Sequence, residues 1–147
     1  MTDKNTHTNP ARQVRTNSIG WMLSRITKNQ HIALVAKLKP INLVLNEFII
    51  LMTLMEHEGL TQSQIGAQVS LPAYSTSRAI DALVEKGMVE RRNDVRSRRS
   101  YQIHLTQSGW KIGPQIFAIV NEVNRQLLTK LSKDEKLFLT AILRKLT

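Results

Sequence analysis

The chain has 147 residues and a formal net charge of +10, with 21 Lys and Arg against 11 Asp and Glu. This length suits a single domain with a substantial core, and the excess positive charge favours a polyanionic partner. The absence of cysteine excludes disulfides, a thiol redox switch and Cys-ligated zinc. No apolar run reaches about 18 residues, and the N-terminus lacks the apolar core of a signal peptide, so we expect a cytoplasmic protein without a membrane span.

The N-terminal third is basic, with seven Lys and Arg against one Asp in residues 1–39. Residues 1–17 are polar and have no periodic apolar face, which predicts a flexible basic tail, helical near its end, or an arm that touches DNA or a partner subunit. Ser18 fits the N-cap of a helix that runs from Ile19 to about Lys37, and Pro40 should break it. The next helix should start at Asn42 or Asn46 and end at Glu58-Gly59. Its segment Phe48–Met55 is too apolar for an exposed helix, so we expect this helix to be central.

Residues 60–87 predict a helix, a tight turn and a second helix. Thr61 and Gln64 fit a capping box at the start of the first helix, with Ile65 and Val69 on its apolar face. Pro72 suits the opening of the second helix, and Gly87 suits its C-terminal stop.

The second helix has two different faces. Thr76, Ala79, Ile80, Leu83 and Gly87 recur at the spacing of a core-facing stripe. The opposite side carries hydroxyls and an arginine in its N-terminal half, where the helix end is also electropositive. These residue types suit phosphates and base edges. We therefore predict DNA-contacting residues here and at the start of the preceding helix: Thr61, Gln62, Tyr74, Ser75, Ser77 and Arg78.

A β-hairpin should follow, beginning at Met88-Val89 and returning through Tyr101, Ile103 and Leu105 as a half-buried strand. Its tip holds five arginines within nine residues, Arg91 to Arg99. A charge run of this kind is usually a solvated loop, but behind a helix of this composition it favours contact with phosphates or a minor groove. The predicted contacts in this wing are Asp94, Arg96, Arg98 and Arg99. We expect Asp81 and Asp94 to orient arginines.

The C-terminal part should contain two helices. Thr106 should cap a long helix whose stripe runs from Trp110 to Leu131, with a kink at Pro114. Ser132 and Glu135 form a second capping box, which opens the last helix. The first and last helices carry apolar stripes that one small lobe cannot easily cover, so pairing with a second copy is expected.

The sequence gives no support for an enzyme. The four histidines lie on different expected elements without metal-ligand spacing, and no phosphate-binding glycine loop or nucleophile motif is present. We therefore expect no catalytic residue, metal or cofactor.

The segment STSRAIDALVEKGMVERRNDVRSRR resembles the recognition helix and wing of the MarR family of winged helix-turn-helix regulators. The matches are Ser75, Ser77 and Arg78 at the helix start, Asp81, Lys86, Gly87, Val89 and Arg91 in the middle, and Asp94, Arg96 and Arg99 in the wing. Ser97 stands where a second acid is common in the family. The resemblance is specific over Leu71–Gly109 and extends over nearly the whole chain in helix order.

This resemblance implies a mainly α fold with a small antiparallel β-wing (α+β). Residues 18–147 would form one domain, with a winged helix-turn-helix lobe at 40–105 and dimerisation helices at 18–39 and 106–147. It also implies a homodimer that binds a pseudo-palindromic operator in double-stranded DNA, as a repressor released by a small lipophilic, aromatic or anionic ligand. The family places ligands between the lobe and the dimerisation helices. Here the candidates are Trp21, Met22, Arg25, Met52, Met55 and Trp110, although each of them also fits ordinary core packing.

Two other functions remain open from the residues alone. The protein could be a DNA-binding regulator without a small-molecule ligand, controlled by protein contacts, or it could be a winged-helix module that binds protein or RNA. The arginine-rich wing disfavours a purely protein-binding role. Titration of small aromatic acids against a protein–DNA complex, and competition with a structured RNA, separate these readings.

Overall fold

The computed structural model describes residues 9–94 and 97–147, and the side chains of residues 94–99 also lie outside the described part. The described elements, in chain order, are α1 (Pro10–Asn17), α2 (Ile19–Leu38), a 3-10 turn η1 (Lys39–Ile41), α3 (Leu45–Glu56), β1 (Leu60–Thr61), α4 (Gln62–Gln68), α5 (Ala73–Glu85), β2 (Val89–Asp94), β3 (Ser97–Leu105), α6 (Gln107–Lys111), α7 (Gly113–Leu127) and α8 (Lys133–Leu146). This order confirms a mainly helical fold with a small antiparallel wing.

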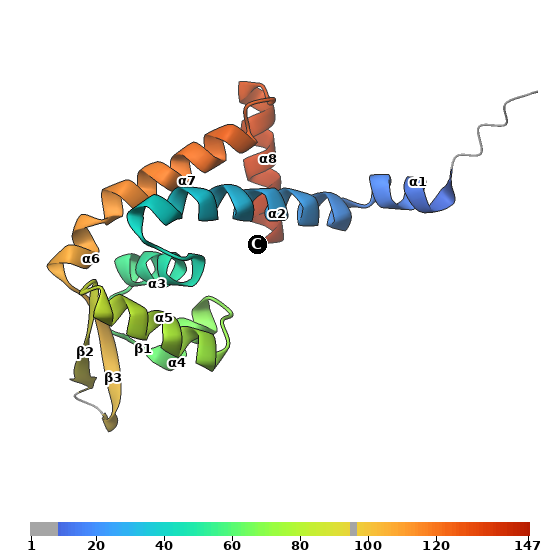
Figure 1. Cartoon of the computed structure of the whole chain (residues 1–147). Coiled ribbons are helices and arrows are strands. Elements are labelled where there is room, and N and C mark those ends of the chain that lie inside the picture. The colour runs from blue at the N-terminus through green and yellow to red at the C-terminus, as the bar shows by residue number, and fades with distance from the viewer. Residues whose placement is uncertain (1–8, 95–96) are drawn as a thin grey trace, which may run out of the picture.

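One lobe contains most of the buried core. Helices α3, α4 and α5 pack together with the sheet, α2 crosses over α3, and α7 runs beside α2 (Figure 1). The apolar side chains with no exposed surface come from all of these helices and confirm the central place of α3: Leu38, Ile50, Leu51, Leu54, Ile65, Ile80, Leu83 and Ile116. The predicted stripes of α4 and α5 are confirmed within the helices, but Val69 is only half-buried and Gly87 is exposed, because both residues follow the last turn of their helix.

The wing belongs to a three-stranded sheet in the order β1-β3-β2. The sequence predicted only the hairpin and missed β1, whose two residues pair as Leu60 with Ile103 and Thr61 with Gln102. Tyr101 lies one residue beyond this pairing and is 54% exposed. The expectation that Tyr101 is half-buried was therefore wrong, because β3 continues past the part of the sheet that the lobe covers (Figure 1).

Most predicted helix starts and stops are confirmed. Ser18, Thr61 and Ser132 accept hydrogen bonds from backbone N–H groups as N-caps, and Gly87 follows α5 in a left-handed conformation with φ +67°. A side chain would strain this backbone, which is why glycine suits the position.

Two helix boundaries differ from the expectation. Asn42 does not start α3. It has φ 56° and ends η1, while Glu47 caps α3 by accepting the Val44 N–H at 3.0 Å. The long helix expected after Thr106 is divided into α6 and α7, which meet at Ile112. Pro114 lies in the first turn of α7, where its missing N–H costs no helical hydrogen bond.

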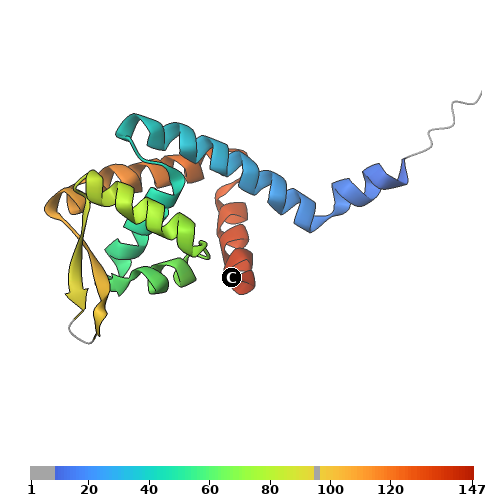
Figure 2. The same ribbon diagram turned by 60° about the horizontal axis from the view of Figure 1, so that its bottom comes forward.

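The end helices are much less covered than the lobe. Part of the expected tail is helical, as α1, and residues 1–8 lie outside the described part. Helices α1 and α8 contain no buried residue, and α8 stands away from the lobe (Figure 2). Leu137 and Phe138 are 64% and 70% exposed. An apolar groove of about 550 Å³ runs between α8 and the ends of α2 and α7, lined chiefly by Leu23, Ile26, Leu127, Leu131, Phe138 and Ile142.

Candidate nucleic-acid interface

The two-faced helix predicted from the sequence is α5. Thr76, Ile80 and Leu83 are fully buried, and Tyr74, Arg78 and Asp81 are exposed on the opposite side. Ser75 and Ser77 are half-buried beside them. The helix-turn-helix therefore places the expected hydroxyl and arginine side chains on one accessible face of α5.

A close approach between α4 and α5 fixes the turn between these helices. A Cβ atom on Gly66 would lie 3.0 Å from Thr76 Oγ1, which is tighter than nearly all such contacts. The Thr76 hydroxyl donates to the Pro72 carbonyl at 3.1 Å. Ser70 completes the turn with φ 54°, a conformation that costs a side-chain-bearing residue energy. Packing thus sets the angle at which α5 is presented.

The start of α4 is occupied by its own cap. Thr61 N–H donates to Gln64 Oε1 at 2.8 Å, and Gln64 N–H donates back to Thr61 Oγ1 at 3.3 Å. Thr61 and Gln62 are both half-buried. The predicted capping box is confirmed, and DNA contact by these two residues stays a prediction.

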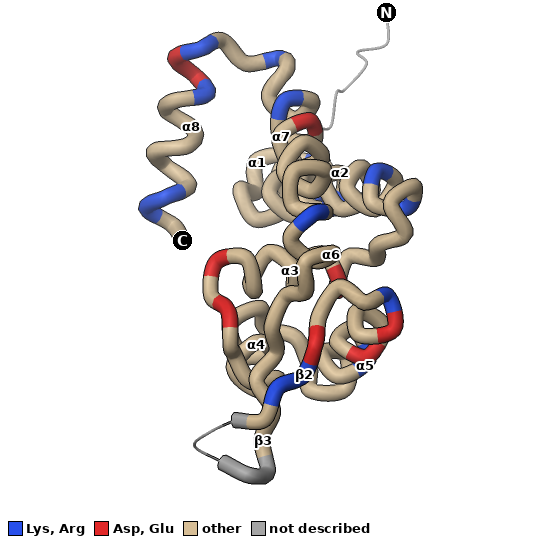
Figure 3. Tube along the Cα trace, turned by 90° about the vertical axis from the view of Figure 1, so that its left-hand side faces the viewer, with Lys and Arg blue, Asp and Glu red and all other residues tan. Residues whose placement is uncertain are grey.

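The base of the wing joins α5 through an ion pair. Arg91 Nη2 lies 2.5 Å from Asp81 Oδ1, which agrees with the expected role of Asp81 in orienting an arginine. Arg92 lies against Glu90, so both wing arginines whose side chains are described are paired with acids. Figure 3 shows the basic positions of β2 leading toward the tip of the hairpin. The predictions for Asp94, Arg96, Arg98 and Arg99 lie outside the described side chains.

The C-terminal end of α5 is tied to α3 by a buried carboxylate that the sequence analysis missed. Glu47 is 3% exposed, and Lys86 Nζ lies 2.6 Å from its Oε2. The same ammonium donates to the Asn42 carbonyl at 2.7 Å. The available signal was the position of Glu47, three residues after Val44, where a capping-box acid stands. Its partner is 39 residues away along the chain.

The same end of α5 is also tied to α6. Thr106 Oγ1 donates to the Gly87 carbonyl at 2.6 Å, and the Thr106 N–H donates to the Met88 carbonyl at 3.0 Å. A Cβ on Gly109 would collide with the Met88 carbonyl, so only glycine fits there. These contacts connect the lobe directly to the helices that leave it.

The six candidate ligand residues do not converge on one cavity. Two guanidinium groups lie near the Trp21 ring, with the guanidinium carbons of Arg15 and Arg25 at 5.3 and 5.4 Å from its centroid. Met22 and Trp110 are 43% and 47% exposed, and Met52 and Met55 are half-buried on α3. None of the six lines a nearby crevice of about 240 Å³ between α2, α3 and α7, which is lined by Thr27, Gln30, His31, Leu34, Leu45, Phe48, Val120, Val123 and Asn124.

The resolved pKa shifts lie away from this interface. Hydrogen bonds from the Arg125 guanidinium lower the pKa of Glu122 and raise the pKa of Arg125 itself. The Ser132 backbone N–H lowers the pKa of Glu135 within the cap of α8. These three groups lie on α7 and in the first turn of α8.

The described residues contain no group of three or more His, Asp or Glu side chains placed to hold a metal ion. In residues 9–94 and 97–147 no single helix is long and apolar enough to cross a membrane. The segments Ile19–Ile41 and Leu45–Glu56 together have the length and composition of a membrane span, but they are bent by 83° relative to each other.

Comparison with known proteins gives consistent matches. The sequence model described as MarR family matches residues 41–100. The chain is similar to the HTH-type transcriptional repressor Rv2887 of Mycobacterium tuberculosis, with 26% identity over 128 residues, which are 87% of this chain and 92% of that protein.

Solved structures agree with this result. A MarR transcriptional regulator from Methanosarcina mazei has 28% identity and a TM-score of 0.81, over 87% of this chain and 92% of that one. A mutant MarR from E. coli, solved in complex with operator DNA, has the same fold, with 23% identity and a TM-score of 0.78 over 90% of this chain and 96% of that one.

Proposed function

The chain belongs to the MarR family of transcriptional regulators, and from that membership we propose that it is a sequence-specific repressor that binds a pseudo-palindromic operator as a homodimer. The observation that carries the proposal is the exposed face of α5, where an arginine and hydroxyl groups lie beside the base of the wing, which the Arg91–Asp81 ion pair joins to α5. Two copies of α5 would enter successive major grooves about 34 Å apart.

Selection from random duplexes tests this function. The full chain, incubated with a random duplex library at fixed salt, should enrich one inverted repeat. Affinity for that duplex should fall by about 10³–10⁵ between 50 and 200 mM salt if the dimer neutralises roughly 6–10 phosphates. Enrichment of no sequence, together with a flat salt response, would contradict DNA recognition.

Arg78 and Ser77 are proposed as residues that read base edges. Arg78→Ala and Ser77→Ala should each reduce discrimination between the selected duplex and random DNA by about 1–3 kcal/mol, the value of a good base contact. Equal losses on both duplexes would instead assign these side chains to the phosphate backbone.

The wing residues Asp94, Arg96, Arg98 and Arg99 belong to the same proposal. Arg96→Ala should cost about 1–3 kcal/mol of DNA affinity without lowering the melting temperature. Asp94→Ala should also weaken binding, although it removes a negative charge, because we assign Asp94 to orienting the wing arginines. Tighter binding by Asp94→Ala would contradict that assignment.

Release by a small ligand is the finer part of the proposal. The crevice between α2, α3 and α7 supports it, because this crevice lies where the lobe meets the end helices and has polar groups at an apolar wall. Benzoate and related small aromatic acids, titrated against the protein–DNA complex, should release the duplex. A complex that persists at saturating acid favours a regulator without a small-molecule ligand.

A further inference from the structure

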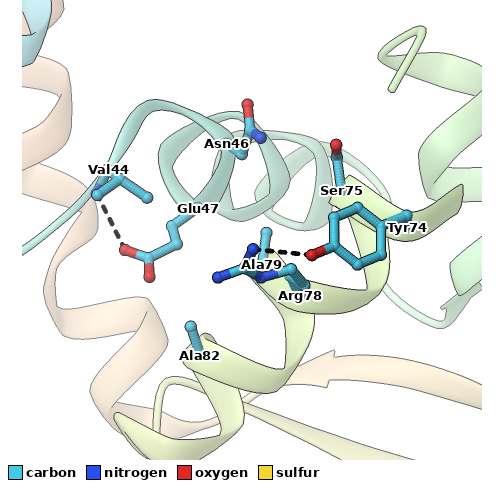
Figure 4. A pocket seen from close by; sticks show the side chains of 8 residues that line it. All are labelled: Val44, Asn46, Glu47, Tyr74, Ser75, Arg78, Ala79 and Ala82. Carbon is cyan, nitrogen blue, oxygen red and sulfur yellow. Dashed lines mark hydrogen bonds between the residues drawn. The ribbon is translucent and has the colours of Figure 1, made fainter. Parts of the chain in front are cut away.

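Tyr74 and Arg78 form a pair on the exposed face of α5. Arg78 Nη1 donates a hydrogen bond to the Tyr74 hydroxyl at 2.9 Å, and the guanidinium carbon lies 5.5 Å from the centroid of the tyrosine ring. Figure 4 shows the two side chains meeting one helical turn apart. A hydrogen bond and a cation–π contact therefore restrain the same guanidinium at once.

This restraint leaves the charge of the arginine available. In the described part of the chain Arg78 makes no ion pair, because Asp81 on the same face is paired with Arg91 and Glu47 is paired with Lys86. Tyrosine is neutral, so it orients the guanidinium without competing for its charge. The guanidinium has five N–H donors, and one bond to a tyrosine leaves enough for a bidentate contact with a guanine.

The surroundings of the pair explain why Arg78 needs such a partner. Arg78 and the carboxylate-bearing Glu47 line the same cleft of about 310 Å³ between α3 and α5 (Figure 4). An unrestrained arginine samples many rotamers and is attracted toward a carboxylate. Tyr74 lines the same cleft, is 69% exposed and has only two rotatable side-chain bonds, so its hydroxyl can hold the guanidinium in one place within the cleft.

We propose that Tyr74 is a positioning residue that preorganises Arg78 for base recognition and so helps to set the sequence preference of this protein. The inference rests on the proposed DNA-binding function and deepens it. Preorganisation reduces the ordering cost that binding would otherwise include, and the benefit is largest on the duplex whose base matches Arg78.

A double-mutant cycle on the full chain tests the pair. The probe is the duplex that the wild-type protein selects from a random library, together with its single base-pair variants. Tyr74→Phe should weaken binding to the selected duplex by about 3- to 10-fold, which is the range of one net hydrogen bond. It should also flatten the preference at the base pair where Arg78→Ala flattens it. In the Arg78→Ala background, Tyr74→Phe should have no further effect.

Tyr101→Phe is the matched control. Tyr101 is the other tyrosine of the chain and is also exposed, but it lies on β3. Removal of its hydroxyl should have the same effect with and without Arg78. All variants should have the melting temperature of the wild-type protein, because both tyrosines are exposed.

The outcomes separate this inference from the proposed function. If the wild-type protein selects a duplex and Tyr74→Phe has equal effects in both backgrounds, including no effect, the positioning role is overturned and the DNA-binding function stands. If the wild-type protein selects no duplex, the proposed function fails and this inference fails with it.

Discussion

The lobe and the end helices differ in how far their apolar side chains are buried. In the lobe, residues such as Leu54, Ile80 and Leu83 have no exposed surface, and one core joins α3, α4, α5 and the sheet to Leu38 at the end of α2 and Ile116 of α7. In α8 no residue is buried, and Phe138 remains 70% exposed. The lobe therefore buries its own core within one chain, and exposed apolar side chains like those of α8 are the kind that a second copy would cover in the proposed homodimer.

The largest expected effect is loss of lobe stability by truncation of its core. Leu54→Ala should lower the free energy of unfolding by about 2–5 kcal/mol, because it removes buried methyl groups and leaves a cavity. Urea denaturation measures the loss. The folded variant should keep the oligomeric state of the wild type, since Leu54 lies inside the lobe. A loss below 1 kcal/mol would mean that the lobe is not the stable unit.

The second largest effect should come from breaking the ion pair between Glu47 of α3 and Lys86 at the end of α5. Glu47→Ala removes the carboxylate that accepts from Val44 and Lys86, so it should lower the free energy of unfolding by about 2–3 kcal/mol, somewhat less than for a fully buried pair because Lys86 is 22% exposed. Adding Lys86→Met should recover part of this loss, because it removes the ammonium that Glu47→Ala leaves without its carboxylate partner. Strictly additive losses would contradict a direct coupling.

A change on α8 should act on assembly instead of on the lobe. Phe138→Asp should weaken dimerisation by about 1–3 kcal/mol, because a charge replaces an apolar side chain of the groove between α8, α2 and α7. Sedimentation of a dilution series measures the dissociation constant. Thr140→Asp adds the same charge on the same helix away from the groove lining, and it should leave the dimer unchanged. Equal effects of the two variants would assign the loss to charge alone.

The smallest effect concerns pH and the cap of α8. The Ser132 N–H lowers the pKa of Glu135 below its usual 4.5. A depressed carboxylate pKa stabilises the folded state above the unfolded value, and this contribution is lost as the pH falls through the folded value. Glu135→Gln should therefore melt slightly below the wild type above about pH 5, and the difference should vanish in stronger acid. A difference that persists in acid would contradict the charge-based account.

The sequence predicted what depends on neighbouring residues. Capping boxes at Thr61 and Ser132, the stop at Gly87 and the two faces of α5 all follow from spacings of a few residues. The start of α3 was predicted at Asn42 or Asn46, and the helix begins at Leu45, so only the first alternative was wrong. Asn42 could serve either as a cap or in a left-handed turn, and packing decides between them. Strand β1 has two residues, which is too short for any alternation pattern.

The parts of the site that escaped prediction depend on long-range packing. Glu47 of α3 and Lys86 at the end of α5 are 39 residues apart along the chain, and no spacing rule predicts that two such residues will pair. The link between Tyr74 and Arg78 lies at helical spacing, but both residues were interpreted separately as DNA contacts. The six ligand candidates were chosen from three expected helices, and the structure does not gather them into the crevice between α2, α3 and α7.

The division between a complete lobe and incomplete end helices is tested most directly by the mass of the protein in solution. Light scattering at micromolar concentration and moderate salt should give the mass of two chains, and addition of the selected duplex should give two chains per duplex. A single chain in both measurements would contradict the account, because the exposed apolar side chains of α2 and α8 would then have no partner.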